Sequence, residues 1–218
     1  MQKVKFYRAV EEKKGDEELF CPYKDTMRAP GNVPYIVDNL WEWSRPEGFP
    51  CRRHAAYASP SPQLALQSGP EGGKIYLIEF FGEVKIAQLK GFSDSKEHPD
   101  CKLLKKTLIN LLKESTEDWW LDWDLEKKKE FGQLWMPCLR KREVEHLFAN
   151  VPELHNIRSQ ISSAITYWND VELIDVDQES FPDKEGEIFF EAKGGYQLVD
   201  TKQAIIGDLK SQILEYIG

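Results

Sequence analysis

Hydrophobic and polar residues follow a strand-like pattern at the two ends of the chain and a helical pattern in its middle. Residues 3–10 place Val4, Phe6 and Ala9 among polar neighbours and predict an opening strand. The run 74–81 is almost continuously apolar, which is typical of a central strand, and 83–90 follows as its expected partner after a turn at Gly82. Further strands are expected over 53–59, 171–177, 186–192 and 196–200.

The middle of the chain carries the helical signals. Leucines recur along one face of 101–114, and Leu154, Ile157 and Ile161 share a face of 153–168. Helix is also expected over 118–135, and Ser61 followed by Pro62 is a good helix start leading into 63–67. Five prolines between residues 21 and 50 favour an ordered loop there, with at most a short helix around 36–43. An amphipathic helix is expected over 202–216.

Strands at both ends with helices gathered between them indicate an α+β protein and not a doubly wound parallel sheet. At 218 residues the chain is expected to be one domain, 1–218, with a helical insertion over about 100–168. The sequence contains neither GxGxxG nor a P-loop, so a nucleotide is not expected to bind at a glycine-rich helix start.

The net charge of −8 argues against generic, charge-driven binding to nucleic acid or to an anionic membrane. No apolar run is long enough to span a bilayer, and residues 1–10 lack a signal-peptide core, so a cytoplasmic location and no membrane partner are expected. The four cysteines form no CxxC pair, and the histidines form no HExxH, so no metal is expected.

Three places depart from an ordinary core-and-surface pattern. Arg8 lies inside the opening strand, Tyr57-Ala58-Ser59 ends a strand before a helix, and Glu185 and Glu187 stand two residues apart before an apolar strand. Each also has a plain structural interpretation: a solvated charge, a turn with a helix cap, and a solvated acidic cluster.

Taken together, the Arg8, Tyr57-Ala58-Ser59 and Glu185-x-Glu187 elements resemble the three-part signature of the ADP-ribosyltransferase family. That family has Arg or His on its first strand, an aromatic-plus-Ser element on its second, and Glu-x-Glu before a late strand. The resemblance covers about 1–90 and 171–200. It implies a split β-sandwich of two small sheets around an NAD cleft, with NAD as substrate.

The resemblance also implies a role for each residue. Glu187 would stabilise the oxocarbenium-like ribose formed as nicotinamide leaves, and Glu185 would contact or deprotonate the acceptor. Arg8 would hold phosphate or ribose oxygens, Tyr57 would face the nicotinamide, and Ser59 would orient Glu187. The run Arg45, Arg52, Arg53 and His54 would flank the cleft and meet the pyrophosphate or a nucleic-acid target, or else is solvated surface.

The expected function is an NAD-dependent mono-ADP-ribosyltransferase, an intracellular toxin or defence effector that an antitoxin could restrain. The acceptor is expected to be a protein, with RNA as runner-up. Two alternatives stay open: an NAD glycohydrolase on the same fold, and a non-catalytic binding module. The seven tryptophans, with Trp119, Trp120 and Trp123 clustered, motivate the latter, although core packing is their commoner use.

Overall fold

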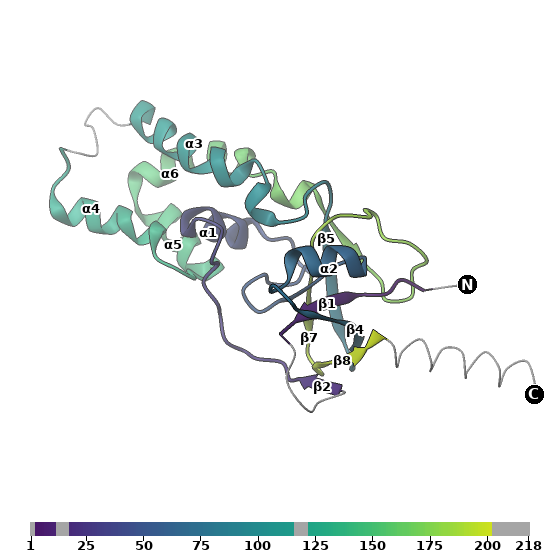
Figure 1. Ribbon diagram of the computed structural model, residues 1–218. Helices are drawn as coiled ribbons and strands as arrows, with labels where there is room; N and C mark the ends of the chain where they lie inside the picture. The colour runs from purple at the N-terminus through teal and green to yellow at the C-terminus, as the bar shows by residue number, and fades with distance from the viewer. Residues whose placement is uncertain (1–2, 12–17, 116–121, 202–218) are drawn as a thin grey trace, which may run out of the picture. The chain divides into compact units, whose positions relative to one another are not determined.

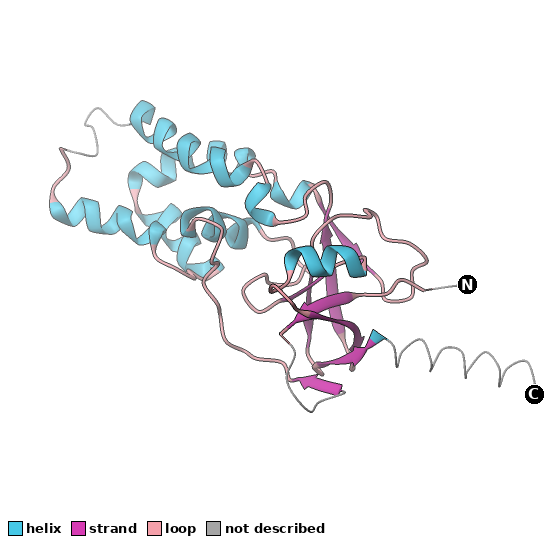
Figure 2. Cartoon of the chain, in the orientation of Figure 1, coloured by secondary structure: helices cyan, strands magenta, loops and turns pink. Residues whose placement is uncertain are grey.

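The computed structural model describes residues 3–11, 18–115 and 122–201 (Figure 1). These residues divide into two compact units. One is built mainly of strands and comprises Met1–Asp25, Ala55–Ser93 and Leu173–Gly218; the other is helical and comprises Thr26–His54 and Asp94–Glu172. Figure 2 shows the strands gathered in the first unit and most helices in the second. The protein is therefore α+β, and its helical unit takes in 26–54 as well as the expected central helices.

Two four-stranded sheets organise the strand unit. The first has the order β1-β4-β8-β2 and the second β3-β7-β5-β6. Every pairing that the register describes is antiparallel. The strands are β1 (Tyr7–Val10), β2 (Glu18–Cys21), β3 (Ala56–Ala58), β4 (Lys74–Phe80), β5 (Val84–Leu89), β6 (Val171–Ile174), β7 (Ile188–Ala192) and β8 (Tyr196–Asp200).

The expected strand order is correct in part. The opening strand and the central position of β4 are confirmed, since β4 lies between β1 and β8. The expected hairpin of 74–81 with 83–90 is wrong, because β4 and β5 belong to different sheets. Gly82 adopts a φ of +66°, a left-handed conformation that glycine accepts easily and that lets the chain pass from one sheet to the other. Strand β2 was not expected.

The core of the strand unit lies on the apolar faces of both sheets. Phe6, Tyr76, Ile86, Ile188 and Phe190 belong to one buried cluster. Aromatic rings pack edge to face within it: the Phe6 and Phe80 centroids lie 5.3 Å apart, and those of Phe80 and Phe190 lie 4.9 Å apart. Helix α2 (Pro62–Ser68) belongs to this unit and begins as expected, since the Ser61 side chain accepts a hydrogen bond from the Leu64 N–H.

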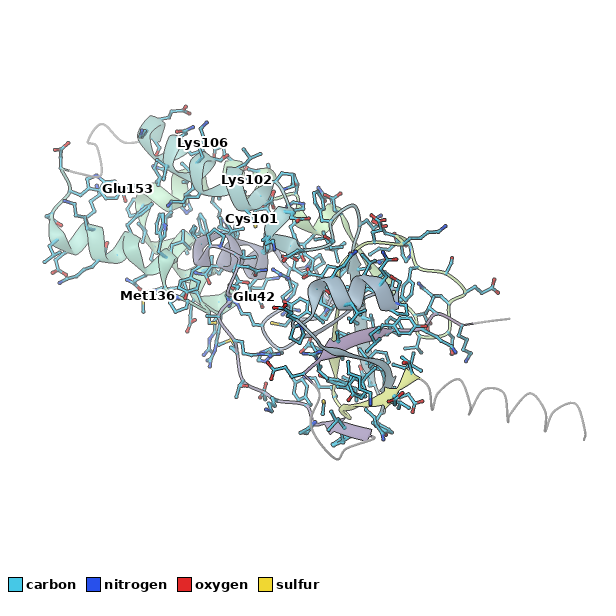
Figure 3. The ribbon with its side chains drawn as sticks, viewed as in Figure 1. Glu42, Cys101, Lys102, Lys106, Met136 and Glu153 are labelled. Atoms are coloured by element: carbon cyan, nitrogen blue, oxygen red, sulfur yellow. The ribbon has the colours of Figure 1, made fainter. Side chains whose placement is uncertain are left out.

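The helical unit packs amphipathic helices together. In α3, Leu104, Leu108 and Leu112 are buried, while Lys102 and Lys106 are exposed on its polar side (Figure 3). The expected helix over 118–135 is shorter in the described residues, where α4 covers Leu125–Gly132. The helices are α1 (Tyr35–Ser44), α3 (Asp100–Ser115), α4, α5 (Lys141–Asn150) and α6 (Pro152–Ala164), with short 3-10 turns at Ser95–Glu97, Gln133–Trp135 and Tyr167–Asn169.

The tryptophans that the structure describes serve mainly the core. Trp41 stacks on Tyr167 with centroids 4.0 Å apart, and its indole nitrogen donates to Asp100 at 2.9 Å. Trp43 stacks on Phe148, and Trp123 is only 5% exposed. Trp119, Trp120 and the helix expected over 202–216 lie outside the described residues.

Candidate functional site

The candidate site residues of the strand unit lie in segments whose backbones pair with one another. Tyr7 and Ser59 form an isolated antiparallel bridge in which each N–H donates to the other's carbonyl, at 3.0 and 2.8 Å. The β3–β7 register pairs Tyr57 with Phe189 and Ala58 with Ile188, so its continuation places Ser59 opposite Glu187. Three segments far apart in the sequence, around residues 7, 59 and 187, therefore meet.

The faces of these strands separate the side chains into two groups. Tyr57, Ser59 and Glu187 share one side of the β3–β7 pair, because facing residues of an antiparallel pair project to the same side. Tyr57 is 37% exposed and Ser59 is buried, with its hydroxyl 3.4 Å from that of Ser68 in α2. Arg8 follows Tyr7 and projects from the other side of β1, together with Phe6 and Val10 of the core. The chain thus brings the three strands together but does not bring the Arg8 side chain onto the Glu187 face.

Arg8 is a half-buried cation without a carboxylate partner among the described residues. Its Nη1 donates to the hydroxyl of Tyr196 at 2.6 Å. A guanidinium withdrawn from water normally pairs with an acid, because desolvating an unpaired charge costs free energy. This arrangement leaves Arg8 able to bind an anionic group of a ligand.

Gln88 fixes the turn that carries the two glutamates. Its side chain is fully buried. Nε2 donates to the carbonyls of Asp183 and Gly186 at 2.8 and 3.0 Å, and Oε1 accepts from the Asp183 N–H at 3.0 Å. Because all of these partners are backbone groups of one turn, Gln88 holds the conformation of the segment that leads into Glu187.

Gly186, between the two glutamates, is required by close packing. A Cβ built at this position would lie 2.2 Å from the carbonyl oxygen of Leu89. Glu187 follows directly, and its backbone N–H donates to the Phe92 carbonyl while its own carbonyl accepts from the Leu89 N–H, both at 2.9 Å. Glu187 is half-buried and Glu185 is exposed. The two carboxylates therefore differ in their solvent environment.

Asp183 joins the same turn to the end of β5. Its carboxylate accepts from the backbone N–H groups of Gly91, at 2.5 Å, and Glu185, at 2.9 Å. These backbone hydrogen bonds, led by that of Gly91, lower the pKa of Asp183 below its ordinary value. The ionised carboxylate is the form that holds the turn.

Arg53 and His54 belong to the helical unit. Arg53 is 3% exposed, and all three of its nitrogens have protein partners. Nε donates to Asp38 at 2.8 Å, Nη2 to the Asn39 side-chain oxygen at 2.7 Å, and Nη1 to the Leu139 carbonyl. Arg53 is therefore a structural residue, and the expected contact with a pyrophosphate would require this network to break. His54 is half-buried, and its backbone N–H donates to the Cys51 carbonyl.

Sequence reasoning missed Gln88 and Asp183. One signal was present for Gln88, since it is an uncharged polar residue between the apolar Ala87 and Leu89, where an unpaired amide would be costly. Asp183 gave none, because an aspartate in a Pro- and Gly-containing turn is common.

Among the residues that the structure describes, no cluster of three or more His, Cys, Asp or Glu is arranged to hold a metal ion. Within the same residues no helix is long and apolar enough to cross a membrane. Comparisons with protein-family models, with curated proteins and with solved structures found no match to this chain.

Proposed function

We propose that this protein is an NAD-dependent ADP-ribosyltransferase that acts on a macromolecular acceptor. The observation that supports it best is the pairing of Tyr7 with Ser59 together with the pairing of Ala58 with Ile188, the residue that follows Glu187. These pairings join the strand of Arg8, the strand of Tyr57 and Ser59, and the Glu185-x-Glu187 turn, the three elements of the family signature that the sequence resembles. Two small antiparallel sheets meeting at these pairings are also consistent with the split sandwich of that family.

The chemistry assigns different roles to the two glutamates. The bond between nicotinamide and ribose C1′ breaks with its electron pair leaving on nicotinamide, and positive charge develops on the ribose. The Glu187 carboxylate would stabilise that charge. A nucleophilic atom of the acceptor then forms a bond to C1′ and loses a proton, which the exposed Glu185 would accept.

The remaining residues would bind the substrate. Tyr57 shares the Glu187 side of its strand and offers an aromatic face to the nicotinamide. Arg8 would bind a phosphate or ribose oxygen from the other side of β1, and its lack of a carboxylate partner within the described chain supports this role. Ser59 would position the Glu187 turn through the paired backbone.

The test is incubation of the protein with NAD labelled in its adenylate part, with free nicotinamide and labelled macromolecule measured separately. A transferase releases nicotinamide and labels a protein or an RNA. Nicotinamide without label indicates a glycohydrolase, and the absence of both contradicts the proposal. Glu187→Gln should lower nicotinamide release about a hundredfold, since it removes one charge and little volume.

A further inference from the structure

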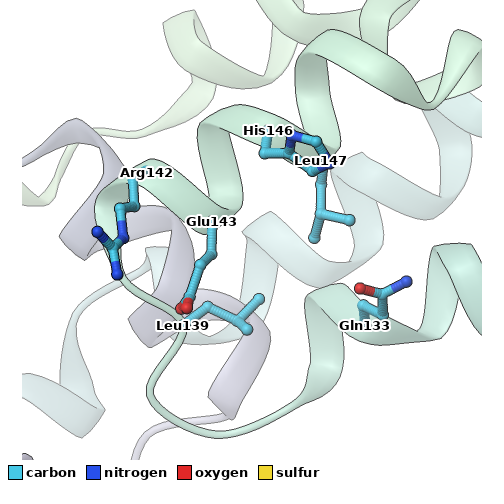
Figure 4. Close-up of a pocket in the computed structure, with 6 residues that line it drawn as sticks. All are labelled: Gln133, Leu139, Arg142, Glu143, His146 and Leu147. Carbon is cyan, nitrogen blue, oxygen red and sulfur yellow. The ribbon is translucent and has the colours of Figure 1, made fainter.

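A cavity of about 460 Å³ lies within the helical unit, and none of the residues predicted from the sequence as site residues lines it. Figure 4 shows Arg142, Glu143 and His146 projecting from α5 on one side, and Leu139 and Gln133 on the segment that precedes it. Leu147 completes the lining. Two of the six lining residues are leucines and the other four are exposed polar or charged residues, so the cavity places a small apolar surface beside charged groups.

The segment before α5 forms one wall of the cavity. Hydrogen bonds from side chains in the interior of the helical unit hold this wall in place. The Asn39 side chain donates to the carbonyls of Leu134 and Met136 at 2.9 and 2.8 Å, and its oxygen accepts from the Leu139 N–H at 3.0 Å. Arg53 donates to the Leu139 carbonyl. Asn39 is fully buried, so the hydrogen bonds that hold this wall start from a side chain withdrawn from solvent.

Maintaining that wall costs the protein stability. Burial raises the pKa of Asp38, the partner of Arg53, although the Arg53 charge opposes the change. Cys138, in the same wall, has a φ of +57° and is the single non-glycine residue with positive φ in the described part of the chain. A left-handed conformation is unfavourable for cysteine, and such strain tends to persist at functional sites.

The polar groups of the cavity favour an anion. The Arg142 side chain makes no ion pair or hydrogen bond with the residues that the structure describes, so its guanidinium can bind a ligand. The Asn150 amide donates to His146 Nδ1 at 3.0 Å, which leaves Nε2 of a neutral imidazole as a hydrogen-bond donor. The two side chains thus supply donors on the same helix, one turn apart.

Glu143 limits the charge that the cavity can accept. One of its oxygens accepts from the Arg140 N–H at 2.7 Å, and its negative charge remains on the cavity wall. The Glu143 charge opposes that of Arg142, so the second charge of a phosphate group gains little net attraction, whereas a singly charged carboxylate can pair with Arg142 alone. The leucines then suit an aliphatic body on the ligand.

We propose that this cavity binds a small aliphatic monocarboxylate, with its carboxylate on Arg142 and His146 and its apolar part on Leu139 and Leu147. This site is independent of NAD chemistry. The positions of the wall residues are set by Asn39 and Arg53, which act as positioning residues and do not touch the ligand.

The test is an NMR titration of the full chain, labelled with ¹⁵N, with 4-methylpentanoate. We expect saturable shifts at the amides of Gln133, Leu139, Arg142 and His146, with a dissociation constant on the order of 1 mM. Arg142→Gln should weaken binding about tenfold, the loss expected for one charge-assisted hydrogen bond. The matched control is Lys141→Gln, which removes the same charge one residue away, from a side chain whose Nζ donates to the Arg45 carbonyl. It should leave binding unchanged.

Inorganic phosphate distinguishes a built site from general anion attraction. We expect phosphate to bind more weakly than 4-methylpentanoate. Glu143→Gln should bring the two dissociation constants closer together. Shifts that do not saturate, shifts outside the cavity, or an equal effect of Lys141→Gln and Arg142→Gln would overturn the proposal. Tighter binding of phosphate than of the carboxylate would also overturn it.

Discussion

Gln88 and Asp183 bind each other twice: the Gln88 amide donates to the Asp183 carbonyl at 2.8 Å, and the Asp183 N–H donates to the Gln88 side-chain oxygen at 3.0 Å. Together with the bond to the Gly186 carbonyl, these contacts tie β5 to the turn that carries Glu185 and Glu187. A glutamine is suited to this position because it donates and accepts at the same time.

Replacement of Gln88 should therefore affect both stability and the turn. Gln88→Leu leaves one buried and two part-buried backbone groups without their partner and should lower the free energy of unfolding by about 2–3 kcal/mol. Urea unfolding measures this loss. Gln67→Leu, at an exposed position of α2, is the control and should change stability by about 0.5 kcal/mol or less. Equal effects of the two substitutions would contradict the proposed role of Gln88.

Gly186→Ala should destabilise the protein through a steric conflict. The new Cβ would lie 2.2 Å from the Leu89 carbonyl oxygen, so the turn or the end of β5 must shift. We expect a loss of about 1–3 kcal/mol in thermal or chemical unfolding. Gly31→Ala is the matched control, since a Cβ there meets nothing within 4 Å. A variant at Gly186 as stable as that control would show that the turn adapts freely.

Arg53→Met should reduce stability and should not change NAD affinity in the folded protein. The substitution leaves Asp38 buried without its partner and removes hydrogen bonds to Asn39 and Leu139, which costs about 3–5 kcal/mol. Lys129→Met breaks an exposed pair with Glu126 and should cost at most about 1 kcal/mol. A rise in the KM for NAD without loss of stability would instead support the cofactor-binding role first expected for Arg53.

Asp183 should make the turn sensitive to acid. Because its folded-state pKa is lowered, Asp183 stabilises the fold above its ordinary pKa, and this contribution is lost as the pH falls through the lowered value. The Tm difference between the wild type and Asp183→Asn should therefore be largest near neutral pH and should shrink below about pH 4. Asp38 has a raised pKa and contributes in the opposite direction, so it does not account for the same trend. Asp122→Asn, at an exposed position, serves as the control.

Glu185→Gln separates transfer from hydrolysis if the proposed function is correct. Glu185 is exposed, whereas Glu187 is half-buried, so Glu185 is the better placed of the two to meet a macromolecular acceptor. We expect labelling of the acceptor to fall about a hundredfold while nicotinamide release falls much less. Equal loss of both activities would assign Glu185 to the ribose instead.

Several elements could be predicted from local sequence. The Ser61-Pro62 start of α2 and the leucine face of α3 were both recognisable because helix caps and amphipathic faces depend on residues within a few positions of each other. The strand character of β4 and β7 was recognisable from their apolar runs. Strand β2 escaped because its four residues follow a charged segment and carry a weak pattern.

The candidate site shows which features local sequence patterns could predict and which they could not. Arg8, Tyr57, Ser59, Glu185 and Glu187 could be selected from the sequence as residues that depart from the ordinary pattern. The side of the strand from which each of these side chains projects could not be predicted. For Arg8, that side follows from the pairing of Tyr7 with Ser59, two residues far apart along the chain. Arg53 looked like a surface cation in the sequence, but it is buried between Asp38, 15 residues away, and the Leu139 carbonyl, 86 residues away along the chain.

The sequence by itself determined that the protein is α+β and where most of its helices and strands lie, because both follow from hydrophobic periodicity and short-range caps. Strand β2 and helix α5 were not predicted. Only the tertiary structure decided how those strands pair. β4 and β5 adjoin in sequence, yet each pairs with distant strands, β4 with β1 and β8 and β5 with β7. Several apolar strands could satisfy the same backbone hydrogen bonds, so the choice among them depends on which arrangement buries their apolar faces together, and that is a property of the whole unit.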